Sequence, residues 1–273
     1  MRKKKFTSWG IAWLLGCCLM LSACSSDEAL QTADGMGAVQ LSLTAGMGFD
    51  AKTKAVDEGN YLMARPLANY TVQIISKKDG SVVPDCEWAY KDVPKGLIEL
   101  PSGDYTIVAF DGKEFNQNAS TRQGIYMYGE TPLTVNSDQV AKKSVRCTPA
   151  CGKLEVKFGA DMEKHFSDYA VHFSTQAVSA NGQIIWPKSD TDPLYVKLDK
   201  AGEKVTATFH ITTKTGKVVN IKPLERDMKW GTRWVITVNP KVEDTTGKVG
   251  ITITFDDSTN DKPIDIEIPS DWL

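Results

Sequence analysis

The chain contains three histidines, His165, His172 and His210, and imidazole is the side chain that most often acts as a general base. His172 and His210 each stand between two apolar residues of an alternating segment, so their rings face solvent if the apolar residues face the core. No G-x-S-x-G or H-E-x-x-H motif accompanies the histidines. We therefore expect a protein that is not an enzyme, with exposed strand histidines, no metal site and no cofactor.

The cysteines are the next residues that could do chemistry. Cys147 and Cys151 are separated by three residues, so they can form a disulfide if their Cα atoms come within about 7 Å. The alternative is that both, together with Cys86, are small buried residues. No spacing of cysteine and histidine matches a zinc site.

Cys24 ends a segment with three recognisable parts. Residues 2–5 are basic, residues 9–21 are mostly apolar, and Leu21-Ser22-Ala23 precede the cysteine. The apolar part is too short for a membrane-spanning helix. Small residues before a cysteine resemble the bacterial lipobox, which implies acylation of Cys24 and removal of residues 1–23. The alternative is an ordinary signal peptide that is cut near Ala23.

The charge balance restricts the partners. The chain has 32 basic and 34 acidic residues, and loss of residues 1–23 would leave 28 basic and 34 acidic residues. A negative surface favours solubility and disfavours binding to nucleic acid. Asp27 and Glu28 resemble the surface-export tag of Bacteroidetes lipoproteins. We therefore expect a protein at the outer membrane, exposed at the cell surface, whose membrane contact is the acylated Cys24.

Most of the chain after residue 37 alternates between apolar and polar residues. Leu154, Val156 and Phe158, for example, alternate with Glu155 and Lys157. The same period recurs at 39–43, 70–74, 105–109, 205–211 and 249–255, with many β-branched and aromatic residues. This period is typical of half-buried strands, and pairs such as Asp79-Gly80 between them favour hairpin turns. The pattern predicts an all-β protein of antiparallel β-sandwiches, with helix limited to residues 161–166.

A weak internal repeat indicates two domains. Tyr70 and Tyr169 begin similar strand and turn segments 99 residues apart, and Gly103 and Gly202 share that offset. We predict a signal peptide at 1–23, a lipidated tether at 24–37, and β-sandwich domains at 38–150 and 151–273. A terminal β-hairpin closes the second domain.

Residues 46–66 have no clear period, and they contain Lys54 and Arg65. A loop of this length is uncommon in a compact domain and is a typical site of proteolysis. Tyr126 and Tyr128 lie in a segment bounded by Gly124 and Gly129, and we expect them to form an exposed platform for a glycan or a protein.

Several segments together resemble a known family. They are Lys52-Thr-Lys54-Ala-Val, Ile98-Glu-Leu-Pro-Ser-Gly-Asp-Tyr105-Thr, Tyr126-Met-Tyr128-Gly, Phe166-Ser-Asp-Tyr169 and Gly231-Thr-Arg-Trp234-Val. These segments identify the chain as similar to a Bacteroidetes lipoprotein family known as domain of unknown function 4493. That family is similar to fimbrillin-like and pilus-accessory proteins, which implies tandem transthyretin-like β-sandwiches. The family has no established activity, so no catalytic residues can be carried over from it.

Three functional hypotheses follow. The leading one is a lipid-anchored surface protein that serves adhesion or assists a fimbria-like assembly, with a surface protein or glycan as partner. The first alternative is a polymerising pilus subunit that is activated by cleavage at Lys54 or Arg65, because loss of the strand at 39–43 would open a groove for a donor strand. The second alternative is a glycan-binding lipoprotein.

Overall fold

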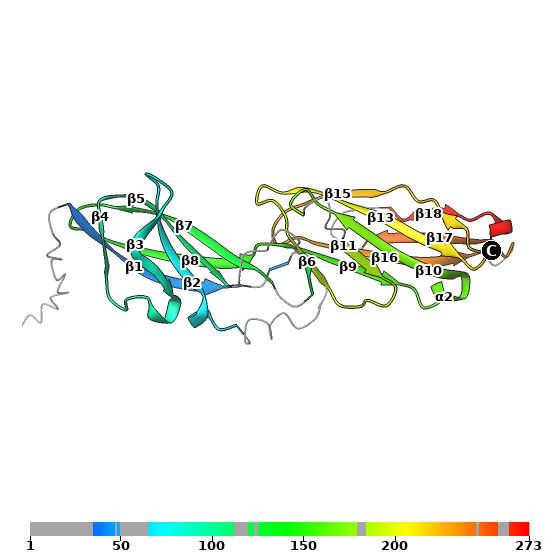
Figure 1. Ribbon diagram of the computed structural model, residues 1–273, viewed down its shortest axis with the longest axis horizontal. Coiled ribbons are helices and arrows are strands. Elements are labelled where there is room, and N and C mark those ends of the chain that lie inside the picture. The colour runs from blue at the N-terminus through cyan, green and yellow to red at the C-terminus, as the bar shows by residue number, and fades with distance from the viewer. Residues whose placement is uncertain are drawn as a thin grey trace, which may run out of the picture. The chain divides into compact units, whose positions relative to one another are not determined.

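A computed structural model describes residues 35–46, 48–49, 65–111, 120–122, 125–178, 184–243, 246–255 and 262–272 (Figure 1). All of these residues belong to one compact unit, Thr32–Leu273. Cys24 and Lys54 lie outside the described residues. Within the described ranges, no helix combines the length and the apolar character that crossing a membrane requires.

The first part of the chain forms a seven-stranded sheet in the order β3-β2-β5-β7-β8-β1-β4. Its strands are β1 (Met36–Ala45), β2 (Thr71–Ser76), β3 (Val82–Ala89), β4 (Ile98–Pro101), β5 (Gly103–Asp111), β7 (Met127–Val135) and β8 (Val140–Pro149). Two short 3-10 helices, η1 (Leu67–Asn69) and η2 (Tyr90–Asp92), flank β2 and β3.

The second part contains a five-stranded and a six-stranded sheet. The first is formed by β10 (Phe166–Ser174), β11 (Ile184–Pro187), β13 (Glu203–Thr213), β14 (Val218–Val219) and β15 (Leu224–Met228). The second runs in the order β18 (Ile264–Glu267), β17 (Val249–Phe255), β16 (Arg233–Val242), β9 (Gly152–Phe158), β12 (Leu194–Val196) and β6 (Ser120–Thr121). The helices here are short: α2 (Met162–His165) and η3 (Ser270–Trp272).

The all-β prediction is confirmed, but the sheets are not purely antiparallel. β1 pairs with β8 in parallel, and β9 pairs with β16 in parallel. These partners are far apart in the sequence, so no hairpin turn sets their relative direction. The predicted turn at Asp79-Gly80 joins the paired strands β2 and β3, and a turn at Gly216 joins β13 and β14. Gly80 and Gly216 have φ values of +74° and +84°, which glycine adopts without strain.

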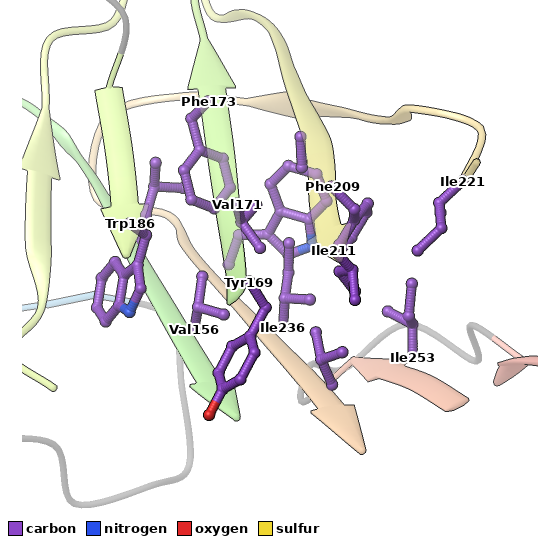
Figure 2. Packing of buried hydrophobic residues seen from close by; sticks show 14 of the residues in the cluster. Val156, Tyr169, Val171, Phe173, Trp186, Phe209, Ile211, Ile221, Ile236 and Ile253 are labelled. Atoms are coloured by element: carbon purple, nitrogen blue, oxygen red, sulfur yellow. The ribbon is translucent and has the colours of Figure 1, made fainter. Parts of the chain in front are cut away.

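Two hydrophobic clusters lie between the strands: the first includes Val39, Val72 and Ile107 of the seven-stranded sheet, and the second lies between the five-stranded and six-stranded sheets. In the second, Tyr169 and Phe173 of β10 and Phe209 of β13 face Val156 of β9 and Ile236 of β16 (Figure 2). These inward positions are the alternating apolar residues of the sequence, and burying each large side chain contributes about 1.5–3 kcal/mol. The alternation of apolar and polar residues thus gives each of these two sheets an apolar face, and burial of the two faces packs the sheets together.

Segments of the two parts interleave. β6 belongs to the connection between β5 and β7, yet it pairs with β12 in the six-stranded sheet. Tyr195 of β12 in turn packs in the first cluster, together with Cys151. The division at residues 150 and 151 therefore stays a prediction.

Candidate functional site

β1 is the strand that follows the predicted tether, and it is an interior strand. Residues 38–45 pair with β8 on one side, and residues 36–39 pair with β4 on the other. Val39 and Leu43 point into the first cluster. A Cβ atom at Gly37 would lie 2.1 Å from the carbonyl oxygen of Asn136, so only glycine lets the start of β1 approach the β7–β8 turn this closely.

Arg65, one of the two predicted cleavage sites, is held to the first sheet. Its guanidinium lies 3.3 Å from the carboxylate of Asp111 at the end of β5. The Arg65 side chain is 40% exposed, whereas that of Asp111 is 11% exposed. This ion pair has to break before the Arg65 side chain can enter the specificity pocket of a protease.

Tyr126 and Tyr128 were expected on an exposed platform, but both are half-buried. The Tyr128 ring meets the Trp230 ring edge-on with centroids 5.6 Å apart, and Lys200 Nζ lies 5.5 Å from the Tyr128 centroid. Tyr126 lies beside Tyr128 with a centroid distance of 6.4 Å. We call Tyr126, Tyr128, Glu130, Lys200 and Trp230 the junction cluster.

Hydrogen bonds connect the polar atoms of the junction cluster. The Tyr128 hydroxyl donates to Glu130 Oε2 at 2.7 Å, and Lys200 Nζ donates to Glu130 Oε1 at 2.6 Å. The Trp230 indole N–H donates to the carbonyl oxygen of Leu198 at 3.0 Å. Lys200 and Trp230 come from the second part of the chain, so the junction cluster connects β7 to the second part through charge-assisted hydrogen bonds.

The ionisation of the junction cluster follows from its packing. Burial raises the pKa of Tyr128, and the hydrogen bond to the Glu130 carboxylate raises it further. The hydrogen bond from Lys200 lowers the pKa of Glu130, and the bond from Tyr128 adds to this effect. At neutral pH the phenol is therefore protonated and the carboxylate is ionised. Lys200 already covers a face of the Tyr128 ring, so the cluster suits a fixed contact within the protein rather than a platform for a ligand.

The predicted disulfide between Cys147 and Cys151 is not formed in the structure. Both cysteines are buried, and no disulfide joins them. Cys147 Sγ points into the first cluster and donates to the carbonyl oxygen of Ala109 at 3.4 Å. Burial raises the pKa of Cys147 to about 12, with the charge of Asp111 as a second cause, so this thiol is not reactive at neutral pH.

A buried group of charges lies where β9 and β16 pair. Arg233 donates to Glu155 through Nε at 2.8 Å and through Nη2 at 2.7 Å, and Lys153 Nζ lies 3.3 Å from the same carboxylate. Lys153, Glu155 and Arg233 are 0%, 9% and 5% exposed, and we call them the buried charge triad. Phe49, which follows β1, lies 5.7 Å from Lys153 Nζ and 5.8 Å from the ring of Tyr195.

Sequence reasoning missed the buried charge triad. The alternation around Leu154 and Val156 correctly places these residues in the core, and it therefore assigns Glu155 to solvent. In the structure all residues from Gly152 to Val156 are buried, because β9 is covered on both faces. No local signal reveals this cover. The partner residues Lys200 and Trp230 were missed for the same reason, since their contacts with β7 are long-range.

A family described as Domain of unknown function (DUF4493) matches residues 35–270. No curated protein matches the chain. A solved fimbrial assembly protein from Parabacteroides distasonis is similar, with 12% identity and a TM-score of 0.41, over 84% of this chain and 99% of that one. The fimbrial anchor protein Mfa2 from Porphyromonas gingivalis is similar with 12% identity and a TM-score of 0.36, over 83% and 99% of the two chains.

Proposed function

We propose that this chain, which belongs to the family described as Domain of unknown function (DUF4493), is a lipid-anchored protein of the outer membrane that is exposed at the cell surface. In this proposal it is not an enzyme: it serves adhesion or acts as an accessory of a fimbria-like assembly, and it binds a surface protein or a glycan. Its membrane contact is the acyl group on Cys24.

The observation that carries the proposal is the place of β1 in the sheet. The predicted tether leads from Cys24 directly into β1, which is hydrogen-bonded to β8 over residues 38–45 and to β4 over residues 36–39. A pull on the anchor would load β1 along its own axis. Many backbone hydrogen bonds would then have to break together, because the bonds of a sheet lie across the strand direction. This arrangement suits a protein that stays attached by its N-terminus while its partner pulls on it.

The contacts between the two parts of the chain support the same role. The junction cluster joins Tyr128 and Glu130 of β7 to Lys200 and Trp230 of the second part, and Phe49, which follows β1, lies 5.7 Å from Lys153 Nζ of β9. Fixed contacts of this kind let a load pass from β1 into the second part. A surface protein of this type needs a stiff scaffold more than it needs a reactive site.

The test is a comparison of the natural chain with Cys24→Ser in the producing bacterium. We expect the natural protein in the outer-membrane fraction, and we expect protease added to intact cells to digest it. The serine variant should be released from the membrane. Continued membrane attachment of the serine variant would overturn the anchoring proposal, and full protection of the natural protein in intact cells would overturn surface exposure.

A polymerising subunit is the second candidate, and the interior position of β1 also favours it. Loss of β1 would remove one of the two neighbours of β8, would separate β4 from the rest of the seven-stranded sheet and would open a groove the width of one strand. This candidate requires cleavage at Lys54 or Arg65. The ion pair between Arg65 and Asp111 favours the intact chain. If the anchored form is the working one, cleavage at Arg65 has no role, and Arg65→Gln should leave the amount of processed protein unchanged.

A further inference from the structure

Two of the three histidines of the chain are in direct contact on the outer face of the five-stranded sheet. The ring centroids of His172 and His210 are 3.9 Å apart, and the ring planes make an angle of 32°. His172 lies on β10 opposite Thr208 of β13, and His210 is two residues further along β13. The pair is thus a diagonal neighbour pair of two antiparallel strands, which brings long side chains within reach of each other.

The strands hold the two rings in place. Val171 and Phe173 on β10, and Phe209 and Ile211 on β13, flank the histidines and are buried in the second cluster. The backbone beneath the rings is therefore fixed by packing on the opposite face. His210 is exposed and His172 is half-buried, so both rings can be reached from solvent. Binding an ion therefore has to order only the two side chains, because the backbone positions of both histidines are already set.

We propose that His172 and His210 form a binding site for a divalent transition-metal ion of the copper, nickel and zinc class. Imidazole nitrogen is a preferred ligand of these ions, whereas Ca²⁺ and Mg²⁺ prefer oxygen ligands. Two nitrogens that bind one tetrahedral ion at 2.0–2.1 Å stand about 3.3 Å apart, which is within reach of two imidazoles on neighbouring strands whose rings are already in contact. Binding requires both rings to turn from this contact until one nitrogen of each points at the ion.

The ligand set decides which ion binds best. Among the described residues, no group of three or more His, Cys, Asp or Glu is placed to hold a metal, so water completes the coordination of a two-histidine site. Such an open site has no geometry that excludes Cu²⁺. The general order of affinity for nitrogen ligands then predicts that Cu²⁺ binds more tightly than Ni²⁺ or Zn²⁺.

The experiment is a calorimetric titration of the full-length protein, purified without a polyhistidine tag, with CuCl₂, ZnCl₂ and CaCl₂. We expect one Cu²⁺ per chain, weaker binding of Zn²⁺ and no binding of Ca²⁺. His210→Ala is the decisive variant, because the side chain is exposed and its loss leaves the core intact. It should weaken Cu²⁺ binding at least about tenfold, and His172→Gln should do the same.

His165→Ala is the matched control, since it removes the third histidine of the chain and leaves the pair in place. It should bind Cu²⁺ as the natural protein does. Saturating Cu²⁺ should also raise the thermal midpoint of the natural protein and not that of His210→Ala, because the ion binds the folded state. The proposal is overturned if the natural protein shows no saturable binding, or if His210→Ala and His172→Gln bind Cu²⁺ with unchanged affinity.

Discussion

Removal of Arg233 from the buried charge triad should destabilise the protein strongly. The carboxylate of Glu155 is 9% exposed and receives two hydrogen bonds from Arg233, at 2.8 and 2.7 Å. Breaking a buried ion pair leaves a charge without its partner, which costs about 3–5 kcal/mol. Lys153 remains 3.3 Å from the same carboxylate, so we expect Arg233→Met to lose about 3 kcal/mol, the lower end of the range.

The assay is urea unfolding followed by tryptophan fluorescence, since Trp186 and Trp234 are buried in the second cluster. Lys204→Met is the matched control. Lys204 pairs with Glu225 at 2.8 Å, but both side chains are more than half exposed, so its loss should leave the free energy of unfolding unchanged within error.

A triple variant separates charge from packing. Replacing Lys153, Glu155 and Arg233 together with Met, Leu and Met removes all three charges and keeps similar volume. It should recover most of the stability that Arg233→Met loses, because no buried charge is left unpaired. A loss of less than about 1 kcal/mol for Arg233→Met, or a triple variant that is less stable than the single one, would refute this reasoning.

Three further predictions concern acid stability, close packing and the junction. Burial raises the pKa of Glu155, but the bonds from Arg233 and Lys153 outweigh this and hold the pKa below its usual value. The stabilisation from Glu155 is therefore complete above the unfolded-state pKa of about 4.3 and is lost as the pH falls through the lower folded-state value, so Glu155→Gln should flatten the acid limb of a stability-against-pH curve. Gly37→Ala should lower the thermal midpoint because its Cβ would meet backbone 2.1 Å away, whereas Gly96→Ala, with open space around it, should not. Lys200→Met should speed hydrogen exchange in β7 near Tyr128 by removing the bond to Glu130, and unchanged exchange would contradict a bracing role for the junction cluster.

The period of the apolar residues was enough to predict most of the strands and their inward faces. Leu154 and Val156 of β9, for example, lie in the second cluster as predicted. The same rule wrongly predicted that Glu155 is exposed, because alternation assumes that one face of a strand is exposed to solvent. Phe49 and Tyr195 cover the outer face of this region, and their approach depends on the path of distant segments.

Strand direction and side-chain partners were the parts that local patterns could not supply. The parallel pairs of β1 with β8 and of β9 with β16 have no connecting turn that would fix their direction. The short spacing of Cys147 and Cys151 suggested a disulfide, but no disulfide joins them, although both are buried in the first cluster. The contact between His172 and His210 likewise depends on the register of β10 against β13, which the two separate alternating segments do not reveal.

The central claim is that the chain works as an anchored protein that retains β1. Mass spectrometry of the native protein, purified from outer membranes, tests it most directly by identifying the N-terminal residue and its modification. We expect an acylated Cys24 on a chain that still contains β1. A native chain without lipid, with a new N-terminus directly after Lys54 or Arg65, would contradict the account and would make strand donation between subunits the working mechanism.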